Sequence, residues 1–122
     1  MEWTISFLPE KRIVVIKTYG VADETSSMEM VKNISRNMAK HLSLRCLIDH
    51  TDISSVSGST VEIYYRPKGL INIGVPFKVM IAEVIKPEHR EHFHFLETVF
   101  RNRGFNFRIF DDRESAMEWL TK

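Results

Sequence analysis

The amino-acid sequence predicts an α/β fold in which helices pack on a mixed, mostly parallel five-stranded sheet. Five short segments rich in β-branched and aromatic residues recur along the chain, and stretches with hydrophobic residues at helical spacing separate the last four. Strand–helix–strand units place their strands in parallel through right-handed crossovers, so only an opening hairpin should be antiparallel. The expected element order is β-β-α-β-α-β-α-β-α.

The chain is expected to open with this antiparallel hairpin. Residues 2–8 alternate apolar and polar side chains, as a half-buried strand does. Residues 12–19 are denser in β-branched residues and therefore suit a central strand. Gly20 should end this second strand.

The first helix is expected at residues 23–41, and a third strand follows at residues 44–49. One hydrophobic stripe runs along the helix: Met28, Val31, Ile34 and Met38. A helix with a single apolar stripe typically covers one face of a sheet.

The second half of the chain continues the alternation. Residues 77–85 are almost all apolar, as in a buried strand. The helix after it should start near Pro87 and end before Gly104, which is expected to form a left-handed cap. Residues 105–110 form the fifth strand, and residues 112–122 contain the closing helix. Three residues of that helix should turn inward: Ala116, Trp119 and Leu120.

Composition describes an ordinary globular protein and excludes several partner classes. The net charge of +1 gives no electrostatic reason to expect nucleic acid or an anionic membrane surface. The single cysteine, Cys46, cannot form an internal disulfide, which fits a reducing compartment. No signal peptide or long apolar span is visible. We therefore expect one cytoplasmic domain over residues 1–122, without a transmembrane segment.

The stretch DHTDISSVSGSTVEIYY, residues 49–65, suggests a phosphate-binding loop, a phosphorylation switch or a polar bend before a helix. Ser59-Thr60-Val61-Glu62 has the S-x-x-E form of a helix capping box, and Asp111 begins a similar arrangement before the last helix. A phosphate-binding loop is excluded, because the stretch has one glycine and no Gly-Lys-Ser/Thr sequence.

Three segments resemble the STAS fold of SpoIIAA-like proteins, the relatives of anti-sigma-factor antagonists: CLIDHTDIS, FKVMIAEV and FLETVFRNRGFNFRIFDDRESAMEWL. The resemblance covers essentially the whole chain and implies the same fold. In the antagonist branch, a serine within Asp-Ser-Ser-Gly is phosphorylated just before the second helix. The corresponding residues here are Ser55-Val56-Ser57-Gly58, so the resemblance makes Ser57 the candidate phospho-acceptor.

Four polar residues follow strands that should point the same way: Asp49, His50, Asp52 and Asp111. Ligands of α/β sheets bind at that edge, and an acidic cluster can hold Mg²⁺. Helix capping by Asp111 and a turn at Asp52 explain the same residues without a metal, and we prefer this interpretation.

The histidines of EHREHFHF do not predict a zinc site. His89 and His92 share a helix face while His94 points elsewhere, and no Cys or His pair with matching spacing completes a site. A solvated helix face is the preferred interpretation. Cys46 lies within a strand and should behave as a small hydrophobic residue. We therefore expect no metal, no cofactor and no catalytic residue, and so no enzyme.

The segment between Val61 and Phe77 carries more apolar side chains than a short helix can bury, and Pro67 should end or kink that helix after two turns. The residues in question are Val61, Ile63, Tyr64, Tyr65, Leu70, Ile71 and Ile73. They indicate a partner surface, an apolar pocket, or a helix fully packed on the sheet.

The leading hypothesis is a non-catalytic, cytoplasmic regulatory or protein-interaction module of SpoIIAA-like type that forms a homodimer or binds another protein. The alternative is a carrier or sensor of a small apolar, lipid-like ligand in a pocket near residues 61–77, because the SpoIIAA-like fold resembles Sec14-type lipid-binding domains. A flat apolar face in this segment would favour a protein partner, and a roofed cavity would favour a ligand.

Overall fold

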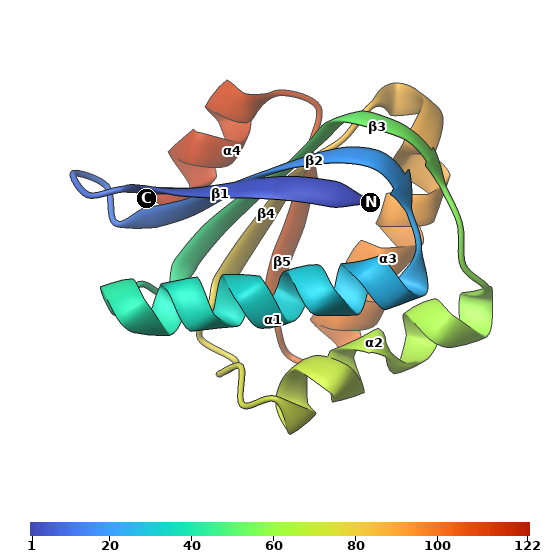
Figure 1. Ribbon diagram of the computed structural model, residues 1–122, viewed down its shortest axis with the longest axis horizontal. Coiled ribbons are helices and arrows are strands. Elements are labelled where there is room, and N and C mark those ends of the chain that lie inside the picture. The colour runs from blue at the N-terminus through green and yellow to red at the C-terminus, as the bar shows by residue number, and fades with distance from the viewer.

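The computed structural model describes residues 1–122 and contains one sheet with the strand order β1-β2-β3-β4-β5 (Figure 1). β1 (Glu2–Leu8) pairs antiparallel with β2 (Ile13–Ala22). β3 (Arg45–Val56), β4 (Met80–Val84) and β5 (Asn106–Phe110) continue the sheet in parallel. The predicted order of elements and the mixed sheet are confirmed.

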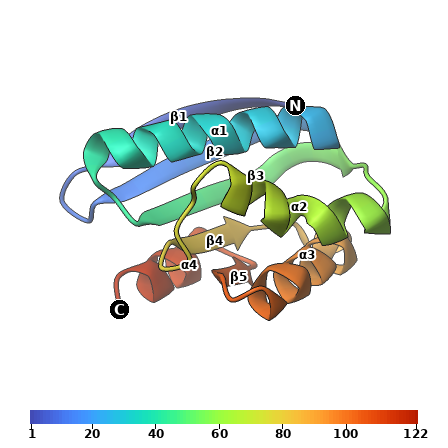
Figure 2. The same cartoon turned by 90° about the horizontal axis from the view of Figure 1, so that it is seen from below.

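The helices lie on both faces of this sheet. α1 (Glu24–His41) and α3 (Arg90–Asn102) cover one face, and α4 (Arg113–Leu120) covers the other. α2 (Thr60–Asn72) lies between α1 and α3 and packs mainly against them (Figure 2). A short 3₁₀ turn, Pro87–His89, precedes α3. None of the helices has the length and hydrophobicity that crossing a lipid bilayer would require.

The sheet separates two hydrophobic clusters. The larger one lies under α1, α2 and α3 and takes Val14 and Ile16 from β2. The smaller one lies under α4 and takes the alternate residues, Ile13 and Val15. Burial on both faces explains why the central strands are continuous apolar runs in the sequence.

Two strands run further than the sequence predicts. β2 continues through Gly20 to Ala22, so the prediction that Gly20 ends the strand is wrong. β3 continues from Asp49 to Val56, which makes the first half of the serine-rich stretch a strand rather than a loop. The register between β2 and β3 shifts twice in this region, and Gly20 has φ +84°. Bulges with a glycine allow a strand to bend without ending.

Pro67 lies inside α2 and does not end it, contrary to the prediction. The helix continues to Asn72, and Pro67 is buried. Proline removes one backbone hydrogen bond from a helix. The turns on either side are held by Ile63 and Leu70, which are both buried in the larger cluster.

The closing helix differs from the prediction in its cap and in one inward residue. Asp112, not Asp111, is the N-cap and accepts a hydrogen bond from the Ser115 amide at 2.7 Å. Ala116 and Leu120 are fully buried. Trp119 is only partly buried at the edge of the smaller cluster, where its ring lies 5.8 Å from that of Phe110.

Candidate functional site

The Ser57 loop joins the end of β3 to α2 and lies at the surface. Ser57 is exposed, while its amide donates a hydrogen bond of 2.8 Å to the Ala22 carbonyl at the end of β2. Gly58 has φ +125°, a conformation that favours glycine. The loop therefore holds the Ser57 backbone against the sheet just before α2 begins.

The capping box predicted at Ser59 is present. The Glu62 amide donates to Ser59 Oγ at 3.1 Å, and the Ser59 amide donates to Glu62 Oε2 at 3.1 Å. The two bonds satisfy two amides at the start of the helix. The second half of the serine-rich stretch is thus a helix cap.

We expect replacement of Ser59 by alanine to lower the free energy of unfolding by about 0.5 to 2 kcal/mol, and replacement by aspartate to change it little, because aspartate caps equally well. Ser57→Ala should stay within about 0.5 kcal/mol of the wild type, because the hydrogen bond from Ser57 to the Ala22 carbonyl uses the backbone amide, which the substitution keeps. Urea unfolding of the three variants measures these differences. A loss for Ser57→Ala as large as that for Ser59→Ala would contradict this account of the loop.

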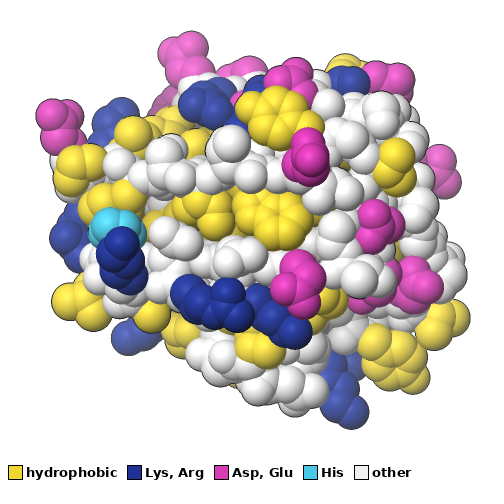
Figure 3. Space-filling model, in the orientation of Figure 1, with side chains coloured by type: hydrophobic (Ala, Val, Ile, Leu, Met, Phe, Trp, Pro, Cys, Tyr) yellow, Lys and Arg dark blue, Asp and Glu magenta, His cyan; other side chains and the backbone are white.

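α2 has an outward apolar face. Four of the seven predicted surface residues are between 40% and 64% exposed: Val61, Tyr64, Tyr65 and Ile71. Ile63 and Leu70 are instead buried in the larger cluster, and Ile73 is partly buried. The Arg103 guanidinium lies 5.6 Å from the centre of the Tyr64 ring, a cation–π contact that ties this face to the end of α3. Hydrophobic side chains are visible over α2 at the lower right of Figure 3.

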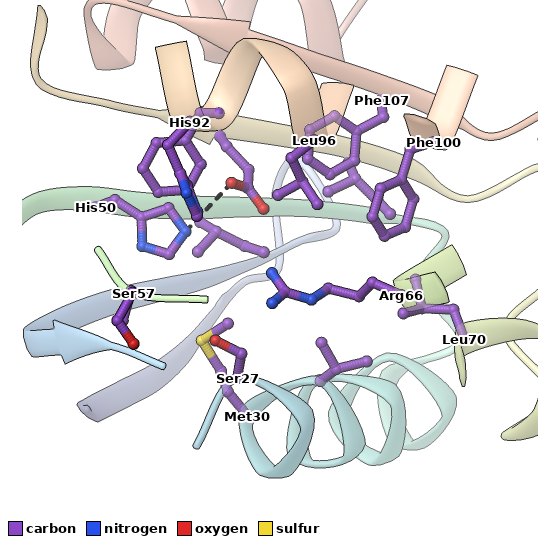
Figure 4. A pocket seen from close by; sticks show the side chains of 16 residues that line it. Ser27, Met30, His50, Ser57, Arg66, Leu70, His92, Leu96, Phe100 and Phe107 are labelled. Atoms are coloured by element: carbon purple, nitrogen blue, oxygen red, sulfur yellow. Dashed lines mark ion pairs between the residues drawn. The ribbon is translucent and has the colours of Figure 1, made fainter. Parts of the chain in front are cut away.

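The inward side of α2 roofs a cavity of about 50 Å³ between α1, α3 and the sheet (Figure 4). Apolar walls come from Leu70 of α2, Met30 of α1 and Phe93 of α3. Six polar side chains also line the cavity: Ser27, His50, Ser57, Arg66, Glu83 and His92. Polar side chains that are enclosed in a hydrophobic cluster need hydrogen-bond or ion-pair partners within the protein.

A hydroxyl, an imidazole and a carboxylate are aligned across three neighbouring strands beside this cavity. Thr18, His50 and Glu83 are each at most 5% exposed. Thr18 Oγ1 donates to the Asp49 carbonyl at 3.1 Å and lies 2.7 Å from His50 Nδ1. Because the hydroxyl hydrogen is used, Nδ1 carries a hydrogen and donates it to Thr18. The other ring nitrogen, Nε2, lies 3.3 Å from Glu83 Oε1.

Arg66 and His92 approach the cavity from α2 and α3. The Arg66 side chain is 9% exposed and forms an ion pair with Glu24 of α1. Figure 4 shows its guanidinium reaching into the space between Ser27 and His92. Burial, together with the nearby positive charge of Arg66, lowers the pKa of His92. His92 is therefore neutral at physiological pH.

The aligned Thr18, His50 and Glu83 do not form a nucleophilic site. Thr18 is completely buried, and its hydroxyl hydrogen is bonded to the backbone. A catalytic nucleophile must give its proton to the base and reach a substrate atom. The arrangement holds the His50 ring between Thr18 and Glu83.

No protein-family model matches the chain, and no curated protein sequence matches it. Solved structures match almost its whole length. An uncharacterized protein from the DUF3478 family with a SpoIIAA-like fold, from Shewanella loihica PV-4, aligns at 20% identity and TM-score 0.61, covering 98% of this chain and 92% of its own. An anti-sigma factor antagonist from Mycobacterium paratuberculosis aligns at 13% identity and TM-score 0.66, covering 99% and 94%.

The anti-sigma factor antagonist SpoIIAA in its unphosphorylated form aligns at 15% identity and TM-score 0.57, covering 98% of this chain and 97% of its own. This chain has the SpoIIAA-like fold. The resemblance predicted from the sequence is confirmed at the level of architecture. A shared fold at 13% to 20% identity does not by itself imply a shared function.

Of the four polar residues predicted at the sheet edge, only Asp49 and Asp52 meet, at the shared partner Lys17, whereas His50 pairs with Glu83 and Asp111 with Arg90. Asp49 points away from the cavity and pairs with Lys17 at 3.2 Å and Arg113 at 3.1 Å. Burial alone would raise the pKa of Asp49, but hydrogen bonds from Thr51 and the charge of Lys17 outweigh it and lower the pKa. Asp52 also pairs with Lys17, while Asp111 pairs with Arg90. No group of three His, Cys, Asp or Glu residues that could hold a metal is present.

The histidines are not a shared solvated face. His94 alone is exposed, 3.6 Å from Glu97. His89 is buried, and His92 lines the cavity, so the solvated-face interpretation is wrong for these two. Cys46 is buried as expected, and burial raises the pKa of its thiol.

Three residues at or beside the cavity are not predicted from the sequence: Glu83, Arg66 and Thr18. Glu83 carried a usable signal, because it is the one ionisable residue in the otherwise apolar run from Val79 to Ile85. Ionisable residues are rarely fully buried without a partner. Arg66 and Thr18 have no such signal, since each lies among residues that are exposed in part.

Proposed function

We propose that this protein is a non-catalytic, cytoplasmic regulatory module that binds a protein partner through the outward face of α2. The observation that supports this proposal is the set of four exposed apolar residues on α2 defined above. Two structural neighbours bear the name anti-sigma factor antagonist, which describes proteins that act on a protein partner. An enzymatic function has less support, because Thr18 is too buried to act as a nucleophile.

The geometry of α2 suits an interface. Val61, Tyr64 and Tyr65 are spaced at i, i+3 and i+4, so they share one side of the helix. Tyrosine is enriched in protein interfaces because its ring gives a large contact area and its hydroxyl tolerates water. Packing of α2 against α1 and α3 holds this face in a fixed orientation before any partner binds.

A second copy of the chain is the partner that we propose. Self-association through a two-fold axis would place the outward face of one α2 against that of the other. The net charge of +1 presents little long-range repulsion between two copies. Ser57 lies just before this face, so we propose it as the site where a phosphate, with nearly two negative charges, would weaken the contact.

The alternative hypothesis, that the protein binds a lipid-like ligand, has less support. An apolar cavity next to Leu70 and Val75 measures only about 40 Å³. An apolar cavity that holds one benzene molecule measures roughly 150 Å³. The cavity lined by Arg66 is similarly small and carries buried charges. The exposed face of α2 therefore supports protein binding better than the interior supports a lipid.

Replacing Tyr65 by glutamate should weaken self-association at least tenfold, because it puts a charge at the centre of the proposed contact. Sedimentation velocity over a concentration series measures the dissociation constant. Tyr19→Glu is the matched control, because Tyr19 is another exposed tyrosine and lies on β2, away from α2. A wild type that stays monomeric at high concentration, or equal effects of the two variants, would contradict the proposed interface.

A further inference from the structure

An open apolar groove lies at the end of the sheet where β3 and β4 begin. It measures about 380 Å³ and runs between the C-terminal turns of α1 and the loop from α2 to β4, which Figure 2 shows at the same end of the molecule. The loop wall consists of residues 74–76 and Val79. The α1 wall has the spacing of one helix face: Ser35, Met38, Ala39 and Leu42. The groove is open rather than enclosed, because Leu42 and Leu44 are 82% and 41% exposed.

Leu42 is the most exposed of the large hydrophobic residues, and its backbone conformation is unfavourable for leucine. It is the C-cap of α1 and has φ +53°, in the left-handed region. Glycine and asparagine are the usual residues in this conformation, because a larger side chain crowds the backbone. The isolated chain therefore gains nothing from a leucine at this position, whereas a partner that covers the groove would bury it.

The two segments that line the groove carry positive charge only. Residues 30–48 and 63–82 contain every lining residue, seven of the 17 Lys and Arg residues, and none of the 16 Asp and Glu residues. Arg36, Lys40 and Lys78 are exposed, and each is adjacent in the chain to a lining residue. The net charge of +1 for the whole chain thus conceals a local excess of positive charge around an apolar surface.

The negative end of the α1 dipole does not offset this excess. The last carbonyl groups of a helix together carry roughly half a negative charge. Those of His41 and Leu42 accept hydrogen bonds from the Arg12 guanidinium at 2.8 and 2.9 Å. The full positive charge of Arg12 exceeds that of the helix end, so the rim of the groove still favours negative groups.

Charge and shape together distinguish between the possible occupants. A second copy that placed its groove against this one would bring two positive rims together, which is unfavourable. An anionic bilayer would match the charge, but it has no side chains that fill a recess between two walls. A helix with aliphatic and acidic side chains matches both the recess and its rim.

We propose that this groove binds an amphipathic helix of another protein. Large aliphatic side chains of that helix would enter between the two walls, next to Leu42, and its Asp or Glu residues would face Arg36, Lys40 and Lys78. The inference goes beyond the proposed self-association, because the groove lies where β3 and β4 begin, whereas the Ser57 loop follows the end of β3.

The test is a fluorescence anisotropy titration of the full-length chain with three synthetic peptides of about 15 residues, long enough to form a helix. The first has leucine at helical spacing and glutamate elsewhere. The second replaces the glutamates by lysine, and the third replaces the leucines by alanine. The first peptide should bind at least tenfold more tightly than either of the others. Added salt should weaken its binding, because the ion pairs lie at the surface.

Two variants locate the bound peptide. Lys40→Glu should weaken binding of the first peptide at least tenfold. Arg108→Glu is the matched control, because it changes the net charge equally and Arg108 is exposed on β5, outside the groove. Leu42→Gly should weaken binding at least tenfold without lowering the melting temperature, because glycine adopts a positive φ without strain. Loss of binding in this variant therefore cannot be ascribed to unfolding.

Three outcomes would overturn the proposal: equal binding of the glutamate and lysine peptides, unchanged binding in Leu42→Gly, and no saturable binding at about 1 mM of the first peptide. Vesicles with phosphatidylserine are a further probe. If Leu42→Gly abolished vesicle binding while no peptide bound, the groove would be a membrane contact instead. Tyr65→Glu should bind the first peptide as the wild type does, so the groove and the self-association interface on α2 can fail independently.

Discussion

Replacing Leu120 by alanine should lower the free energy of unfolding by about 2 to 5 kcal/mol, because it leaves a cavity in a closely packed core. Leu120 is fully buried in the smaller hydrophobic cluster, together with Leu47 and Ala116. α4 has only eight residues, and Ala116 is its other fully buried residue. Leu120 is therefore the larger of the two fully buried side chains by which α4 packs on the sheet.

Trp119→Ala is the matched comparison for Leu120→Ala. The larger side chain of Trp119 is partly exposed at the edge of the same cluster, so its removal should cost less than the removal of Leu120. Urea unfolding followed by circular dichroism measures both losses and does not depend on the tryptophan signal. A loss below about 1 kcal/mol for Leu120→Ala, or a greater loss for Trp119→Ala, would show that the packing of α4 is described wrongly.

The order of elements and the direction of the strands could be predicted because they follow from local patterns. Alternation marks β1, and an apolar stripe marks α1, whatever the rest of the chain does. The ends of β2 and β3 could not be predicted in this way. They extend because each strand offers backbone partners to the other beyond Gly20 and Asp49, and this pairing is a tertiary event that no local pattern encodes.

The distinction between local patterns and tertiary contacts also explains which parts of the sites can be predicted from the sequence. The helix cap at Ser59 and the excess of apolar residues in α2 are local patterns, so the sequence predicts them. Thr18, His50 and Glu83 lie far apart in the sequence and meet because β2, β3 and β4 are adjacent in the sheet. Each residue alone has an ordinary explanation. Their common site is visible only once the strand order and the side of the sheet that each residue faces are known.

Replacing His50 by leucine should be strongly destabilising, by about 3 to 5 kcal/mol at neutral pH, because it leaves the Glu83 carboxylate buried without its partner. The substitution also removes the contact of His50 with Thr18 and the stacking of its ring on Phe93, with 4.9 Å between the two ring centres. Glu83→Met should cost much less, since it leaves a neutral imidazole that still donates to Thr18. Urea unfolding of both variants provides the comparison.

The double variant His50→Leu with Glu83→Met separates the cost of an unpaired charge from the loss of packing. It should be more stable than His50→Leu alone, because no buried carboxylate remains, and the coupling between the two positions should reach about 2 kcal/mol. Additive losses would mean that Glu83 is not held as an ion-pair partner of His50.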